Sequence, residues 1–219
     1  MNSYIKEAQQ LMKDAGHYKS DIDGVFGAGS LLAVKSMLSK LGYEPKAPVN
    51  QKPLAWITEA TKHIGLKEIK GKQHNKTILQ WVKNLNGWFT DDETPWCGIF
   101  LAQCLQEADR GIPKHWYRAL AYLEYGTKLN KPAYGSIAVM RRSGGGHATF
   151  VVGESEDGKY IIGLGGNQSD MVNLAKFPKS RISAYVWPSY KSGVGSSPYP
   201  ERYNLPKYDN NIRISSKES

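Results

Sequence analysis

The chain has 219 residues, enough for one large domain or an ordinary domain with a small one, because domains usually span about 100–200 residues. Its net charge of +9 predicts an acidic partner such as nucleic acid, a membrane surface or an anionic polymer. A hydrophobic content of 40% excludes wide intrinsic disorder, and two cysteines cannot form a disulfide framework. No apolar run is long enough to span a membrane, and the opening MNSYIKEAQQLMKDAG lacks the pattern of a secretory signal, so we expect neither feature.

Residues 1–43 are expected to form a small helical module. Apolar residues at helical spacing predict a helix over 4–15 that ends at Gly16. A glycine-rich loop follows over 17–29, and Ser30 is expected to cap a second helix. The apolar face of that helix would be formed by Leu31, Val34, Leu38 and Leu41. A unit of this size has no room for a buried active site, so we expect it to bind rather than to catalyse.

Three segments of this module resemble the peptidoglycan-binding domain 1 family, a small three-helix module. They are GHY (16–18), DGVFG (23–27) and the capping Ser30. The resemblance implies a wall-binding surface formed by three residues, Tyr18, Asp23 and Phe26. The alternative is that the loop only makes a tight turn and that the phenylalanine fills the module's core.

A change of composition marks the start of a second unit. Residues 44–53 hold three prolines and no apolar periodicity, which predicts an extended linker. Residues 54–188 are expected to form an α+β domain, with helices first and an antiparallel sheet after them. The expected helices cover 54–64, 75–85 and 95–108, and the expected strands are SIAVMR (136–141), HATFVVGE (147–154), KYIIGL (159–164) and AYVWP (184–188). The tail over 189–219 is expected to be either a loose arm or a strap held by its tyrosines.

The segment before Cys97 has the order of a helix start. Thr94 would be the N-cap and Pro95 the first helical residue, which puts Cys97 in the first turn. The unpaired amides and the positive end of the helix dipole favour a thiolate there, as a nucleophilic cysteine requires, and the same amides can donate to an oxyanion. Cys104, two turns further along, is expected to lie in the core. A buried structural cysteine remains the alternative for Cys97.

Two polar residues further along the chain complete a catalytic pattern. His147 follows a run of glycines and opens a predicted strand, and Asn167 follows the next strand within GGNQ. A cysteine at a helix start, a histidine at a strand start and a polar residue that orients the imidazole form the Cys-first order of papain-like hydrolases.

Four ordered motifs make residues 54–188 resemble the cysteine peptidoglycan hydrolases of the CHAP and NlpC/P60 group. They are GLKEIKG (65–71), Trp96-Cys97, Gly146-His147 and LGGNQ (164–168). The resemblance implies a papain-like fold with Cys97 as nucleophile, His147 as general base and Asn167 as the orienting residue. Many CHAP enzymes have a glutamate two residues before the asparagine, where this chain has Gly165. Further residues expected to line the site are Glu68, Trp96 and Gln168.

The implied activity is that of a modular phage endolysin. It would cleave an amide bond in the peptide part of peptidoglycan, as an N-acetylmuramoyl-L-alanine amidase or an endopeptidase, by acyl transfer through the thiol. We expect no metal and no cofactor, because no histidine lies at metal-ligand spacing from a cysteine or an acidic cluster. The protein would act as a monomer and remain in the host cytoplasm until the membrane is breached, then reach the periplasm and the wall. A bacterial toxin or effector of the same chemistry, or a non-catalytic wall-binding virion protein, stay open as alternatives.

The distribution of charge narrows the partner. Residues 1–45 carry no net charge, whereas residues 46–189 hold 19 basic and 12 acidic residues, a net charge of +7. The basic residues are scattered, and no nucleic-acid-binding motif is present, so we expect no nucleic-acid partner. The excess charge instead predicts attraction of the catalytic unit to anionic components of the bacterial envelope.

Overall fold

The computed structural model describes residues 3–25, 28–40, 53–71 and 73–208, and it divides the chain into two compact units. The first unit is Met1–Lys52 and the second is Pro53–Ser219. The boundary therefore falls at the end of the expected linker, most of which lies outside the described residues.

Two helices are described in the first unit, α1 (Ser3–Asp14) and α2 (Ala28–Lys40). The side chains buried in α1 are Gln9 and Met12, whereas Leu11 is 64% exposed. Ser30 lies inside the first turn of α2, so the expectation that it caps this helix is wrong. Val34 packs against the module's small core, and the expected core positions Leu31, Leu38 and Leu41 lie outside the described side chains.

The loop between these helices is organised by Gln9, a buried side chain that the sequence did not single out. Its Nε2 lies 2.9 Å from the Tyr18 hydroxyl and 2.8 Å from Asp23 Oδ1, and its Oε1 accepts from the Gly24 amide at 2.9 Å. Tyr18 is only 5% exposed, so two of the three expected wall-binding residues help to hold the loop. The third, Phe26, lies outside the described residues.

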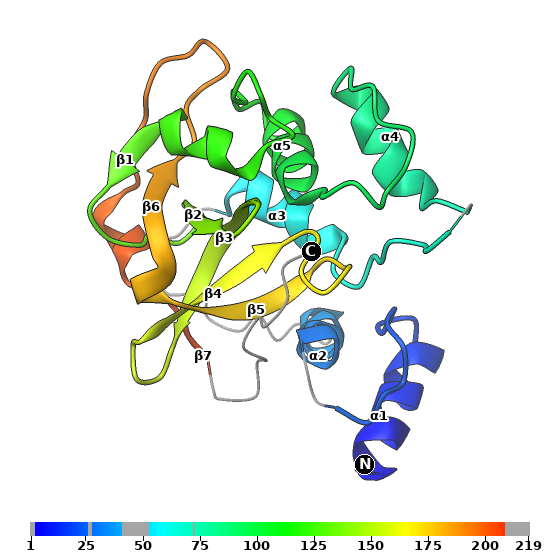
Figure 1. Cartoon of the computed structure of the whole chain (residues 1–219). Helices are drawn as coiled ribbons and strands as arrows, with labels where there is room; N and C mark the ends of the chain where they lie inside the picture. Colours follow the sequence, from blue (N-terminus) through cyan, green and yellow to red (C-terminus); the bar gives the residue numbers. More distant parts are fainter. Residues whose placement is uncertain (1–2, 26–27, 41–52, 72, 209–219) are drawn as a thin grey trace. The chain divides into compact units, whose positions relative to one another are not determined.

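The second unit is an α+β domain with a sheet and helices packed against it (Figure 1). Its α-helices are α3 (Ala55–Lys62), α4 (Lys76–Asn84) and α5 (Cys97–Glu107). Its 3₁₀ turns are η1 (Ala119–Glu124), η2 (Lys179–Arg181) and η3 (Pro200–Tyr203). The strands are β1 (Thr127–Leu129), β2 (Ile137–Arg142), β3 (Gly145–Ser155), β4 (Tyr160–Gly165), β5 (Asn173–Pro178), β6 (Ile182–Trp187) and β7 (Lys207–Tyr208). All three predicted helices and all four predicted strands are present, with shifted ends.

Among the described residues, the strands form one sheet in the order β1-β6-β2-β3-β4-β5, and neighbours along this path run antiparallel. β7 adds a short parallel pairing to the end of β3. Successive side chains of β3 alternate between two hydrophobic clusters. Ala148 and Phe150 belong to the cluster that includes α3 and α5, and Val151 belongs to the cluster on the other face. β3 therefore lies centrally, with a core on each side.

The C-terminal tail is a strap as far as it is described. Arg110 is stacked between Trp56 and Tyr190, with its guanidinium carbon 4.7 Å and 4.4 Å from the two ring centroids. Further along, Tyr208 fills the space beside Gly153, where an added Cβ would collide with its ring. Residues 189–208 thus belong to the second unit, and their end pairs with β3 through β7.

Candidate functional site

Cys97 is the first residue of α5, and Trp96 is its N-cap. The helix therefore begins two residues later than expected, and Thr94 and Pro95 precede it. The cysteine is 2% exposed and belongs to the core cluster on the helix side of the sheet. The sequence thus predicted its place at a helix start correctly, and the structure adds that the thiol is buried.

Two effects act in opposite directions on this thiol. Burial raises the pKa of Cys97, whereas hydrogen bonds from the backbone amides of Ala148 and Gly98 lower it. Burial is the larger effect, so the pKa lies above its ordinary value and the expected thiolate preference is wrong for this conformation. The Ala148 contact also puts the thiol beside the peptide bond that joins Ala148 to His147.

His147 is the third residue of β3 and is 1% exposed. Its ring stacks on Phe177, with centroids 5.4 Å apart, on the face of β3 opposite to the one that carries Ala148. Its Nε2 lies 3.2 Å from Gln168 Oε1. The Cys97 thiol and the His147 imidazole therefore lie near neighbouring residues of β3 but on opposite faces of the strand.

The orientation of the Gln168 carboxamide identifies which nitrogen of the His147 imidazole carries the hydrogen. Its Nε2 lies 2.8 Å from the carbonyl oxygen of Asn173, which can only accept. The amide nitrogen therefore points to Asn173 and the amide oxygen points to His147, so Nε2 of the imidazole donates to it. In the neutral ring, Nδ1 is then the basic nitrogen.

The residue expected to orient the imidazole was Asn167, but the carboxamide on His147 Nε2 is that of the next residue, Gln168. Asn167 is buried and has a left-handed backbone with φ 56°, which turns the chain after β4. The structure also accounts for Gly165, the position at which this chain departs from many CHAP enzymes. An added Cβ there would collide with Gln168 Oε1, so the glycine provides the space that this side chain occupies.

Trp96 and Glu68 lie next to the start of α5, as expected. The Trp96 indole is fully buried, and its Nε1 donates to Glu68 Oε2 at 3.3 Å. Burial, with repulsion from Asp170 and Asp92, raises the pKa of Glu68 despite this hydrogen bond. Both residues therefore adjoin the start of α5, and Glu68 is a half-buried carboxyl group whose pKa is raised there.

Asp92 holds together the loops on either side of α4. This fully buried carboxylate accepts from the amides of Ile69 at 2.9 Å and Asn75 at 2.8 Å, and lies 3.0 Å from His74 Nδ1. Burial raises the pKa of Asp92, but these hydrogen bonds outweigh it and lower the value below 3.8. The carboxylate consequently stabilises the fold at neutral pH, and this contribution is lost as the pH falls through the lowered value.

Replacing Asp92 with asparagine is therefore expected to lower the free energy of unfolding at pH 7 by about 1–3 kcal/mol. The difference between parent and variant should shrink as the pH falls below the ordinary pKa of an aspartate, because the unfolded parent then takes up a proton that the native carboxylate still resists. Urea unfolding midpoints of both proteins, measured from pH 7 to pH 3, check this. A difference that stays constant over this range would contradict the assignment.

Gly98, directly after the cysteine, sets how closely α5 approaches the chain before η1. An added Cβ would lie 2.6 Å from the Trp116 carbonyl oxygen and 2.8 Å from that of Tyr117. Gly98→Ala is expected to lower the free energy of unfolding by about 1–3 kcal/mol, although alanine favours the helix by about 1 kcal/mol. Gly145→Ala is the matched control, because its Cβ meets nothing within 4 Å. Thermal melting of both variants tests this, and equal melting temperatures would refute it.

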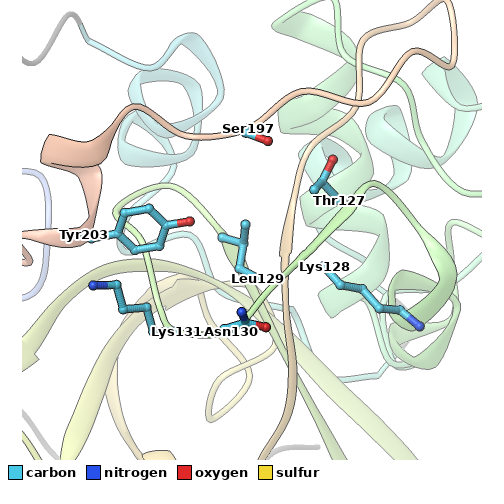
Figure 2. A pocket seen from close by; sticks show the side chains of 7 residues that line it. All are labelled: Thr127, Lys128, Leu129, Asn130, Lys131, Ser197 and Tyr203. Carbon is cyan, nitrogen blue, oxygen red and sulfur yellow. The ribbon is translucent and has the colours of Figure 1, made fainter.

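The two hollows described on the second unit lie away from these residues. The larger, of about 410 Å³, is lined by β1, the turn after it and the strap, as Figure 2 shows. The smaller, of about 340 Å³, adjoins α3.

Within the described residues, no group of three or more histidine, cysteine or acidic side chains is placed to hold a metal ion. None of the described helices is both long and apolar enough to cross a bilayer.

The structure adds two residues to those that the sequence singled out as central. Gln168 was expected only to line the site, and the glycine at position 165 was the signal that its side chain needed room. Gln9 was missed, although it shares a face of α1 with Met12 and so occupies a core position.

Comparisons with protein-family models, with curated proteins and with solved structures find no match to this chain.

Proposed function

We propose that the protein is a peptidoglycan hydrolase that cleaves an amide bond in the peptide part of the bacterial cell wall, with Cys97 as its nucleophile. The observation that supports this best is that Cys97, at the start of α5, lies close enough to the Ala148 backbone amide for that amide to lower the pKa of the thiol. Ala148 follows the buried His147 on β3. The four motifs that resemble the CHAP and NlpC/P60 hydrolases point to the same pair of residues.

In the proposed reaction the Cys97 sulfur attacks the amide carbonyl and His147 accepts the thiol proton. Because Nε2 is engaged with Gln168, this transfer falls to Nδ1. The protonated imidazole then gives its proton to the leaving amine, and a thioester remains on the cysteine. Water, deprotonated by the same nitrogen, attacks the thioester and expels the Cys97 thiolate. The imidazolium returns its proton to the sulfur, and the new carboxylic acid loses its own proton to solvent. Amides at the start of α5 are the donors for the developing oxyanion.

The raised pKa of Cys97 gives the histidine a necessary role in this scheme. A buried thiol with a raised pKa is a weak nucleophile until a base removes its proton. The imidazole extends from the other face of β3, so the transfer requires it to turn toward the thiol.

The biological setting that we propose is that of a phage endolysin. The first unit would hold the enzyme on the wall, and the positive charge of the second unit would attract it to anionic envelope components. A toxin or effector with the same chemistry would share every one of these features. The gene's neighbours distinguish the two, because a holin gene accompanies lysis and an immunity gene accompanies a toxin.

One observation favours a second candidate, a wall-binding protein without catalysis. The thiol is 2% exposed and has a raised pKa, and the imidazole lies across β3 from the core cluster that contains it. Such a protein would bind sacculi and release nothing from them.

Clearing of purified sacculi by the full chain tests the proposal. A fall in turbidity with release of soluble fragments is expected, and sedimentation of the protein with intact sacculi would favour the second candidate. Heparin retention above retention on sacculi at the same salt concentration would instead indicate a nucleic-acid binder.

A further inference from the structure

An exposed cluster of aromatic rings lies on the loops that flank the start of α5. Trp88 stacks on Phe89 with ring centroids 4.6 Å apart, and the Tyr117 ring meets the Trp88 ring edge-on with centroids 4.8 Å apart. We call Trp88, Phe89 and Tyr117 the aromatic platform. Trp88 is 65% exposed, whereas the other five tryptophans of the chain are at most 9% exposed. An indole of this exposure, held by two neighbouring rings, offers a fixed apolar face to a ligand.

The backbone beneath the platform is packed tightly and fixes it relative to Cys97. A Cβ added at Gly87, directly before Trp88, would lie 2.7 Å from a Val82 methyl group and 2.8 Å from the ring of Trp116. On the other side, the Tyr117 carbonyl packs against Gly98, the residue after Cys97. The platform is therefore a rigid neighbour of the start of α5, and it needs little ordering when a ligand binds.

One cation lies at these rings. The Arg118 guanidinium lies 5.5 Å from the centroid of the Tyr117 ring. An aromatic face with a flanking cation suits a ligand that is apolar on one side and carries an anionic group nearby. Bacterial wall polymers have this chemistry, because their sugar rings present C–H groups and their peptides carry carboxylates.

From this arrangement we infer that the platform binds the glycan strand of peptidoglycan, with an N-acetylhexosamine ring stacked on Trp88. The positively polarised C–H groups of the sugar meet the electron-rich face of the indole. The inference rests on the proposed function for its choice of polymer, and it gives the site a glycan-binding surface beside the cysteine. A membrane is a weaker candidate, because one face of the indole is already covered by Phe89 and the ring does not project alone.

Acrylamide quenching of tryptophan fluorescence tests the inference, because Trp88 is the tryptophan most open to the quencher. The full chain is titrated with chitotetraose, a β-1,4-linked tetramer of N-acetylglucosamine, and binding is also measured by calorimetry. The sugar should protect the exposed tryptophan from quenching. Trp88→Ala should weaken binding about tenfold or more, a loss of about 1.4 kcal/mol. Tyr199→Ala removes a tyrosine that is 75% exposed in the strap and should leave the Kd unchanged.

Three results would overturn the inference: no binding of the tetramer by the parent, an unchanged Kd in Trp88→Ala, or protection by vesicles of phosphatidylglycerol without protection by the sugar. None of them depends on hydrolysis. If the protein binds the tetramer but releases nothing from sacculi, glycan binding by the platform is supported and the proposed hydrolysis is refuted. If it clears sacculi but does not bind the tetramer, hydrolysis is supported and glycan binding by the platform is refuted.

Discussion

Alanine in place of Cys97 is expected to reduce the release of new amino groups from purified peptidoglycan by at least about 10³-fold. The proposed reaction passes through a thioester on this sulfur, and the alanine variant has no group that can form this covalent intermediate. The side chain lost is small, so the variant should remain folded. Turbidity and amine release are measured with parent and variant at equal concentration, after circular dichroism has shown equal folding.

The second cysteine of the chain is the matched control. Cys104 is also fully buried on α5, two turns from Cys97, and burial raises its pKa well above the ordinary value. Cys104→Ala should keep hydrolysis close to that of the parent. Equal activity of the Cys97→Ala variant and the parent would contradict the enzymatic account altogether.

Removing the carboxamide of Gln168 is expected to have the next largest effect. Its oxygen holds His147 Nε2, and its nitrogen lies 2.8 Å from both the carbonyl and the side-chain oxygen of Asn173. Gln168→Ala should lower activity about 10- to 100-fold, and it should lower the free energy of unfolding by about 1–3 kcal/mol. ¹⁵N chemical shifts of the imidazole separate the two effects. The parent should carry its hydrogen on Nε2, and the variant should show a mixture of both neutral forms.

Asn167→Gly is the comparison that decides which residue orients the imidazole. Glycine keeps the left-handed backbone of position 167, where φ is 56°, and removes only the carboxamide. We expect this variant to retain the parent's imidazole spectrum and most of its activity. Loss of both in Asn167→Gly, with both retained in Gln168→Ala, would assign the role to Asn167 as the resemblance implies.

The α+β class and the longer elements could be predicted because their patterns are local. The helix over 76–84 carries a clear apolar face, and Asn75 caps it by accepting from the Thr77 amide. Three strands were not predicted. β1 and β7 span three and two residues, too few to show alternation. β5, NLAKFP, is buried on both faces in its middle and holds a buried lysine, so it shows no alternating pattern either.

The candidate site could be predicted only as far as local sequence determines it. Cys97 at a helix start and His147 near a strand start both follow from neighbouring residues. That Gln168 rather than Asn167 contacts the imidazole does not follow from neighbouring residues. It depends on a left-handed turn, after which the Gln168 amide donates to the Met171 carbonyl at 3.0 Å. The raised pKa of Cys97 was equally out of reach, since it comes from burial by segments distant in sequence.

Mass spectrometry of muropeptides after digestion of sacculi tests the central claim most directly. A peptidoglycan amide hydrolase must produce fragments with one new amino group and one new carboxyl group. A free amine on the first alanine would identify an amidase, and a free amine on diaminopimelate or a bridge residue would identify an endopeptidase. The account predicts one of these products with the parent and neither with Cys97→Ala. Fragments with cleaved glycosidic bonds, or no new termini at all, would contradict it.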